Sequence, residues 1–267
     1  GLYLPSSYLS LNTKSDFFTM VHFSQLAVSA LLAAAHASAA LLVDYNAARG
    51  DDVGKMGLVN LEAARGEAQK GNTADLYIKA DNDWKGAKSA HFHRKKGDIR
   101  AEYHALNKKT QEGKTYFIGY QFAVGSTPDA LMVFQWKEYV ANTPEKGGAN
   151  IPLALEVRNG ALKLEYSTHS SGRKEQWSAP IKPKTVYTVG LEILAKDGGQ
   201  GHVRMWWDGK PVTFDTTKST TLQGDLFPGR SDPKFGIYRG EAVVTDNWVY
   251  QVQIGEAKKD LDSKFIS

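Results

Sequence analysis

Polar side chains stand at alternate positions in three short segments that lie far apart in the chain. The segments are 99–104 (IRAEYH), 134–139 (FQWKEY) and 234–240 (KFGIYRG). Alternate side chains of a β-strand point to the same face, so each segment has one apolar and one polar face. The polar faces carry Arg100, Glu102 and His104, then Gln135, Lys137 and Tyr139, then Lys234, Gly236 and Tyr238. Faces of this kind suit an acidic sugar.

These residue types meet the chemical needs of β-elimination in a 4-linked uronic acid. The C5 proton must be acidified, a base must remove it, and the O4 leaving group must be protonated. Gln135, Arg100 and Lys137 can offset the charge of the carboxylate next to C5. Tyr238 can take a proton and return one at the same position, and His93 is the alternative base. No cofactor is required for this chemistry.

The stretch 91–114 is the most basic part of the chain. Arg94 and Arg100 within it are candidates to bind a substrate carboxylate. Arg100 stands in mid-strand, where a forked guanidinium can hold a carboxylate through two hydrogen bonds. Its alternative partners are Glu102 and a residue of a neighbouring strand.

Two histidines precede Arg94 and share one face of their strand. His91 and His93 could begin a metal site, but the sequence places no third ligand at a convincing distance. We therefore interpret His93 as a catalytic or carboxylate-contacting group. Tyr139 is expected to contribute substrate-binding surface beside Lys137.

The bulk composition favours a packed domain with an anionic partner. The 267 residues are 42% hydrophobic and 11% aromatic, with a formal net charge of +4 and no cysteine. Disulfides and a cysteine nucleophile are therefore excluded. Charge is the only argument for nucleic acid, because zinc-ligand spacing and a helix-turn-helix pattern are both missing, so we expect no nucleic-acid partner.

The N-terminal region reads as a leader and not as part of the fold. Residues 20–39 form an apolar run of signal-peptide length that closes on Ala-Ser-Ala, and 1–19 are interpreted as a non-native or untranslated extension. The alternative is a membrane anchor that continues through 41–43, although a histidine and small residues interrupt it. We expect a secreted protein whose domain covers 40–267, with no membrane contact after the leader is removed.

The remaining sequence predicts strands and tight turns with little helix. Residues 153–166 and 202–214 each read as a hairpin, with Asn-Gly and Asp-Gly at their turns. We predict an all-β protein, a single-domain jelly roll of two antiparallel sheets with a concave substrate groove. The side chains expected between the sheets are Phe134, Trp136, Phe235 and Ile237, and those expected in the groove are Gln135 and Tyr238.

Together these segments resemble the jelly-roll polysaccharide lyases, most closely the fungal glucuronan lyases of polysaccharide lyase family 20 and more distantly the alginate lyases. The likeness covers most of 41–255. IRAE at 99–102 corresponds to an arginine-containing motif on a cleft strand of the alginate lyases. QWK at 135–137 keeps the glutamine of a Gln-x-His motif but has lysine in place of histidine. PKFGIYR at 233–239 keeps the glycine and final tyrosine of a third motif. The resemblance implies cleavage of β-1,4-glucuronan, with His93 as the cleft histidine.

Three other interpretations stay open. One is an alginate lyase of the same fold. A non-catalytic carbohydrate-binding jelly roll could use Tyr139 or the pair Trp206 and Trp207 as sugar platforms. A glycoside hydrolase needs two carboxylates across a cleft, and the Glu-x-Asp-x-x-Glu strand typical of such jelly rolls does not occur.

The resemblance also implies a structural calcium ion away from the cleft. Asp246 is the candidate ligand, because calcium prefers hard oxygen donors. We expect a monomer.

Overall fold

The computed structural model describes residues 40–139, 151–167 and 172–267, and these form two antiparallel β-sheets. The described ranges contain no α-helix; their helical turns are the 3-10 segments Ala47–Arg49, Val53–Met56 and Lys258–Asp260. No helix among them is long and apolar enough to cross a bilayer. The expected extension and leader, 1–19 and 20–39, lie outside the described residues.

The larger sheet, sheet A, follows the order β14-β13-β12-β7-β17-β5-β4, with β1 also paired to β17 and β15 to β13. Its strands are β1 (Val43–Asn46), β4 (Leu76–Asn82), β5 (Lys88–Arg94), β7 (Thr115–Val124), β12 (Tyr187–Leu194), β13 (Gly201–Trp207), β14 (Lys210–Pro211), β15 (Leu222–Gly224) and β17 (Thr245–Gly255).

The second sheet, sheet B, follows the order β11-β10-β9-β8-β16-β6-β2-β3. Its strands are β2 (Leu58–Glu62), β3 (Ala68–Gln69), β6 (Arg100–His104), β8 (Met132–Glu138), β9 (Leu153–Arg158), β10 (Ala161–Tyr166), β11 (Lys174–Pro180) and β16 (Ser231–Tyr238). The three polar segments found in the sequence therefore form β6, β16 and β8, which are neighbours in one sheet. The predicted all-β jelly roll of two antiparallel sheets is confirmed.

Both predicted hairpins form at the predicted turns. Asn159 and Gly160 join β9 to β10 with φ angles of 52° and 72°. Asp208 and Gly209 join β13 to β14 with φ angles of 48° and 76°. Positive φ at both central residues is the type I′ geometry that Asn-Gly and Asp-Gly favour.

The core lies between the sheets and contains the four side chains predicted for it. Phe134, Trp136, Phe235 and Ile237 are all at most 1% exposed. The ring of Phe235 lies 5.4 Å from that of Phe134 and 5.1 Å from that of Tyr120 in the opposite sheet. Burying each such side chain contributes about 1.5–3 kcal/mol to folding. Strand alternation then directs the polar residues between them to the other face of sheet B.

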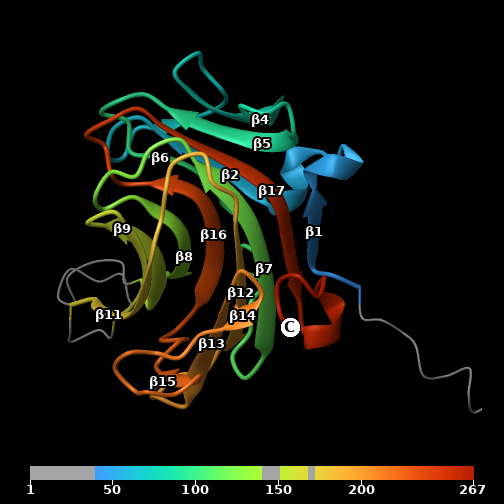
Figure 1. The fold of residues 1–267 in the computed structure, drawn as a ribbon, viewed down its shortest axis with the longest axis vertical. Helices are drawn as coiled ribbons and strands as arrows, with labels where there is room; N and C mark the ends of the chain where they lie inside the picture. The colour runs from blue at the N-terminus through green and yellow to red at the C-terminus, as the bar shows by residue number, and fades with distance from the viewer. Residues whose placement is uncertain (1–39, 140–150, 168–171) are drawn as a thin grey trace, which may run out of the picture. The chain divides into compact units, whose positions relative to one another are not determined.

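Sheet B is curved, and its concave side faces away from sheet A. In Figure 1, β8, β9 and β16 bow toward β7 and β17. The register of β16 against β8 shifts between Phe235 and Tyr238, as in a β-bulge. Gly236 lies in this shift with φ of 135°, and a Cβ there would clash with Phe92 at 2.8 Å. Only glycine fits this position, which sets the direction of Tyr238.

Candidate active site

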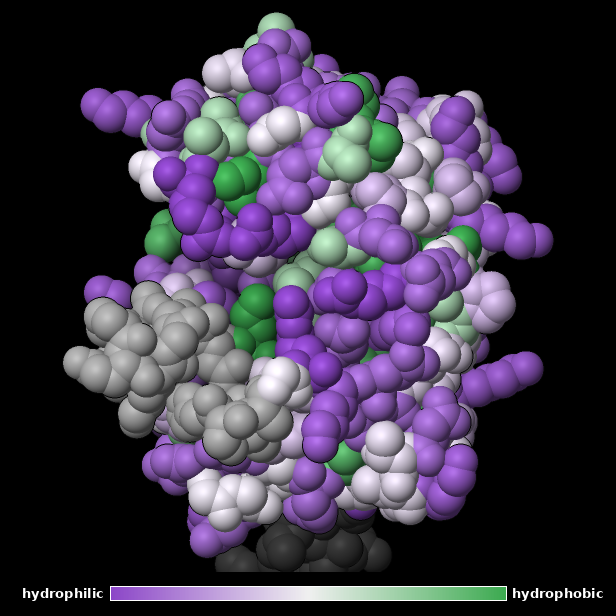
Figure 2. Space-filling model, turned by 90° about the vertical axis from the view of Figure 1, so that its left-hand side faces the viewer, coloured by the Kyte–Doolittle hydropathy of each residue, from purple (hydrophilic) through white to green (hydrophobic). Residues whose placement is uncertain are grey.

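The polar faces of β6, β8 and β16 lie side by side on the concave side of sheet B. Lys234 on β16 pairs with His104 on β6 and with Gln135 on β8, so the three form one row across the sheet. Tyr238 pairs with Arg100 on β6. Figure 2 shows this side of the molecule, where hydrophilic residues predominate and the surface is hollowed near its middle. The predicted site residues of the three motifs thus share one face.

A buried carboxylate organises the centre of this face. Glu102 is 1% exposed and its Oε2 accepts a hydrogen bond from Lys234 Nζ at 2.6 Å. Gln135 Nε2 donates to the other carboxylate oxygen, and Arg100 Nη1 lies 3.6 Å from Oε2. Burial lowers the pKa of Lys234 more than Glu102 raises it. An amide nitrogen has two N–H groups, so Gln135 keeps one donor beyond its bond to Glu102.

One end of the face consists of Tyr238 and its cationic neighbours. The guanidinium carbon of Arg100 lies 4.5 Å from the Tyr238 ring centre, and that of Arg239 lies 5.4 Å away. Arg100 Nε is also paired with Glu62 Oε2 at 2.7 Å. The neighbouring-strand alternative for Arg100 is therefore realised, but its guanidinium still covers the tyrosine. Two guanidinium groups therefore lie against the Tyr238 ring.

The other end of the face contains a histidine and a second tyrosine. His104 stacks on Tyr139 with ring centres 4.9 Å apart and planes 8° apart. His104 Nε2 lies 3.0 Å from Asp232 Oδ2, and its Nδ1 lies 3.4 Å from the Tyr139 hydroxyl. Arg230 and Lys137 lie 4.9 and 5.0 Å from the centre of the Tyr139 ring. This end of the face therefore combines two groups that can transfer protons, the His104 imidazole and the Tyr139 hydroxyl, with the cationic side chains of Arg230 and Lys137.

Burial sets the ionisation of these groups. It raises the pKa of Tyr139, which therefore stays protonated in the free protein. Burial, with the nearby positive charges of Lys234 and Arg100, lowers the pKa of Lys137 to about 8. Burial would raise the pKa of Asp232, but hydrogen bonds from His104, Thr110 and the Lys108 backbone outweigh it and hold that pKa low.

Two predicted site residues, His93 and Arg94, lie outside this face, contrary to the position expected for them in the cleft. His93 lies on β5 in sheet A, and its neighbour Phe92 occupies the space between the sheets, 5.9 Å from the Tyr103 ring. His93 therefore points to the outer side of sheet A. Arg94 is fully buried and donates from Nη2 to the carbonyl oxygens of Arg239 and Gly240, both at 2.6 Å.

The buried Arg94 ties three stretches of backbone together. Its Nη1 also donates to the carbonyl oxygen of Asp98, and burial lowers its pKa to about 10. A guanidinium with these partners holds the turn after β5 against the turn after β16, and a substrate cannot reach it. Arg94 is structural.

His104 was not among the predicted site residues, although strand alternation puts it on the polar face of its strand. The available signal was its spacing, two residues after Glu102 and on the same face. The tryptophans considered as sugar platforms are occupied elsewhere. Trp206 is 7% exposed, and Trp207 packs on Tyr187 and Trp177 at ring distances of 5.0 and 5.2 Å.

The fold is similar to those of known lyases. An endo-β-1,4-glucuronan lyase from the fungus Trichoderma reesei aligns with 78% of this chain and 98% of its own at 18% identity and a TM-score of 0.50. A double-cysteine variant of the alginate lyase A1-II′ aligns with 74% of this chain and 93% of its own at 16% identity and a TM-score of 0.50. At sequence identities of 16–18%, these similarities are evidence for a shared fold and for nothing further.

Comparison at the level of sequence gives the family. No curated protein sequence matches significantly. The family model described as polysaccharide lyase, however, matches residues 58–254, which is well over half of the chain and includes every strand of the concave face. The chain therefore belongs to the polysaccharide lyase family.

Proposed function

We propose that the protein cleaves β-1,4-linked glucuronan by β-elimination and leaves unsaturated uronic acid ends. The observation that carries the proposal is the polar face of sheet B. There Tyr238 lies under Arg100, and Arg100 is joined through Glu102 to Gln135 and Lys234. This arrangement combines a proton-transfer group with donors and cations for a carboxylate.

The first role of the face is to acidify the C5 proton. Charge that develops at C5 spreads onto the substrate carboxylate, and donors aimed at that carboxylate stabilise it. Gln135 offers its second amide N–H, and Lys137 offers an ammonium group while it is protonated. Glu102 keeps Gln135 and Lys234 in place without solvent, so little reorganisation is needed when charge develops.

The second role is proton transfer, which we assign to Tyr238. In a β-glucuronate ring H5 is axial and O4 equatorial, so the two lie on the same side of the ring. One hydroxyl can then remove H5 as phenolate and afterwards protonate O4 as phenol. Arg100 and Arg239 lie beside the ring, where their positive charge can stabilise negative charge that develops during the transfer. Tyr139 suits the role less, because burial raises its pKa.

A second arrangement for proton transfer rests on His104. It lies beside Tyr139 and is bonded to Asp232, a partner that can orient the ring. In that arrangement His104 removes H5 and Tyr139 protonates O4. Single substitutions at the two ends of the face separate this arrangement from the Tyr238 mechanism.

Glucuronan is favoured over alginate by one residue. Lys137 stands where the alginate lyases resembled here have histidine, and a structure similar in fold is that of a glucuronan lyase. Alginate is the second candidate substrate, because glucuronate and mannuronate share their configuration at C4 and C5. The family assignment argues against a binding module, as do the occupied positions of Trp206 and Trp207.

The test is a substrate screen with purified protein. Glucuronan, alginate, heparin and pectate are each incubated with the protein, and the ultraviolet absorbance of unsaturated uronic ends is followed. We expect the highest rate with glucuronan, and a rate at least about 100-fold lower with glucuronan in Tyr238→Phe. Faster cleavage of alginate than of glucuronan would make alginate the substrate. Binding of a polysaccharide without new absorbance would refute the proposed lyase activity.

We further propose that the mature protein acts outside the cell as a monomer, without a cofactor in the reaction. The apolar leader at 20–39 supports export. Mass spectrometry of protein recovered from the growth medium should give an N-terminus near Ala40. Size-exclusion chromatography with light scattering should give one chain per particle. Intact protein retained in cells would contradict export.

A further inference from the structure

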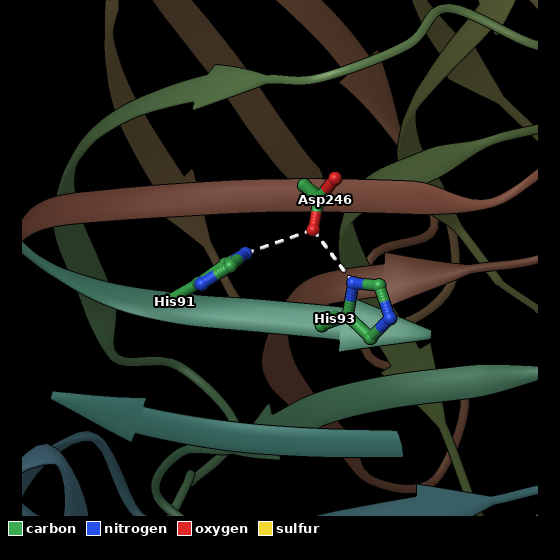
Figure 3. A group of neighbouring side chains, drawn as sticks. All are labelled: His91, His93 and Asp246. Atoms are coloured by element: carbon green, nitrogen blue, oxygen red, sulfur yellow. Dashed lines mark hydrogen bonds and ion pairs between the residues drawn. The ribbon is translucent and has the colours of Figure 1, made fainter. Parts of the chain in front are cut away.

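A second cluster of polar side chains lies on the outer side of sheet A, away from the face described above. His91 and His93 project from β5 toward Asp246 on β17 (Figure 3). His91 Nε2 donates to Asp246 Oδ1 at 2.8 Å, and His93 Nδ1 donates to the same oxygen at 2.7 Å. The sequence supplied two nitrogen ligands without a third; the fold brings the third from 153 residues away.

We propose that His91, His93 and Asp246 form a site for a divalent transition-metal ion of the zinc class, which joins β5 to β17. The three ligand atoms lie within 4.8 Å of one another. Ligands bound at about 2.0–2.2 Å from one zinc ion stand about 3.0–3.5 Å apart. The two histidine–aspartate distances therefore need to open by only a few tenths of an ångström.

The surroundings of the first histidine match those of a metal ligand. His91 Nδ1 is buried and has no hydrogen-bond partner among the described residues, but Asp81 Oδ2 lies 3.6 Å away. A histidine that binds a metal through one nitrogen commonly donates its other N–H to a carboxylate, which fixes the ring and strengthens the ligand. In the absence of metal, both histidines donate to Asp246, and Asp81 is held in place by Lys79 at 3.4 Å and by the backbone N–H of Asn82.

Packing fixes the orientation of the three groups before any ion binds. The His91 ring stacks on Trp248 at 5.2 Å, and the His93 ring stacks on Tyr77 at 4.9 Å. A Cβ on Gly125 would lie 3.2 Å from Asp246 Oδ2, so the carboxylate rests against a backbone without a side chain. The side chains of His91, His93 and Asp246 remain 13%, 21% and 27% exposed, so an ion can enter from solvent.

The donor set selects the metal. Two imidazole nitrogens and one carboxylate oxygen suit zinc, cobalt, nickel or copper, whereas calcium takes six to eight oxygen ligands. The calcium expected at Asp246 from the sequence is therefore not favoured by these partners. Three protein ligands also leave at least one coordination position for water.

The experiment uses untagged full-length protein stripped with EDTA and titrated with ZnCl₂ and, separately, CaCl₂ by isothermal calorimetry. We expect one zinc ion per chain and a higher melting temperature with zinc. His93→Gln and Asp246→Asn should each weaken zinc binding by at least about 10-fold, and Asp81→Asn by about 10-fold. Circular dichroism checks that each variant is folded.

The matched control is His202→Gln. His202 lies on the same sheet, donates to Glu192 at 2.9 Å, and is as exposed as His93, at 21%, but has no third ligand among the described residues. This variant should bind zinc as the unaltered protein does. The proposal is overturned if zinc gives no heat, if calcium binds more tightly than zinc, or if the ligand variants bind zinc no more weakly than His202→Gln does.

Discussion

The carboxylate at the centre of the concave face gives a sharp prediction about stability. Glu102 and Lys234 are 1% and 2% exposed, and their charged atoms lie 2.6 Å apart. Two unit charges at that distance attract by about 6 kcal/mol at an effective dielectric constant of about 20. Glu102→Gln keeps the shape but leaves Lys234 without its closest negative partner. Breaking a buried pair from one side typically costs about 3–5 kcal/mol.

Loss of the Lys234 proton limits this cost. Deprotonation of a lysine at pH 7 costs about 4–5 kcal/mol, because its unfolded pKa is about 10.4 and each unit is worth about 1.4 kcal/mol. Burial already lowers the pKa of Lys234 in the folded protein, and removal of Glu102 must lower it further. We therefore expect Glu102→Gln to reduce the free energy of unfolding by about 3–4 kcal/mol at pH 7.

The same reasoning fixes a sign for the pH dependence. Between the lowered folded pKa and the normal unfolded pKa of Lys234, the unfolded chain binds the extra proton, so stability rises with pH. In Glu102→Gln this range begins at a lower pH than in the unaltered protein, because the folded pKa of Lys234 is lower still. The destabilisation should therefore shrink between the two folded pKa values, by up to about 1.4 kcal/mol per unit, and stay constant from there to pH about 10.

Urea titration followed by tryptophan fluorescence measures these changes. The double variant Glu102→Gln/Lys234→Met should lose less stability than the sum of the two single variants. The matched control is Glu241→Gln at the pair of Arg239 and Glu241, which is 37% and 32% exposed and should change stability by less than about 0.5 kcal/mol. Additivity of the central pair within about 0.5 kcal/mol would refute the coupling.

Three predictions concern the roles of individual side chains. Tyr238→Phe should lower kcat on glucuronan by about 10²–10⁴ and leave KM nearly unchanged. If kcat instead falls this far in His104→Ala and not in Tyr238→Phe, proton transfer belongs to His104 and Tyr139. The KM should rise above pH about 8 as Lys137 loses its proton, and Lys137→Arg should remove that rise; an identical rise in both proteins would exclude Lys137 as its source. Arg94→Lys should lose about 2–4 kcal/mol of stability without a change in KM; a raised KM with normal melting would restore Arg94 as a substrate ligand.

The face of the sheet to which each side chain points was predictable, because it depends on local backbone geometry. Strict alternation in β6, β8 and β16 separates Phe134 and Trp136 from Gln135, whatever the strands pair with. The turns at Asn159 and Asp208 are equally local, since their sequences favour positive φ. Side-chain direction and turn position therefore follow from a few neighbouring residues.

The errors at His93 and Arg94 have a different origin. Residues 91–94 are separated from β6 by only five residues, and this proximity in sequence suggests a position in the same cleft. In the structure the chain crosses to the other sheet within those five residues, so β5 pairs with β17 and β6 with β16. β5 also pairs with β4, and β6 with β2. Sheet membership thus depends on pairing with other strands, two of them more than a hundred residues away, and no pattern inside the segment encodes it.

The same crossing explains why one short stretch serves two regions of the molecule. Phe92 fills the core, so period two sends His91 and His93 outward from sheet A, where Asp246 on the neighbouring strand meets both. Arg94, next in the alternation, points inward and must find acceptors there; the carbonyl oxygens of Asp98, Arg239 and Gly240 meet that need. Those acceptors are the turns that lead into β6 and out of β16. Arg94 thus fixes the ends of the strands that carry Arg100 and Tyr238, and it supports the concave face without contacting a substrate.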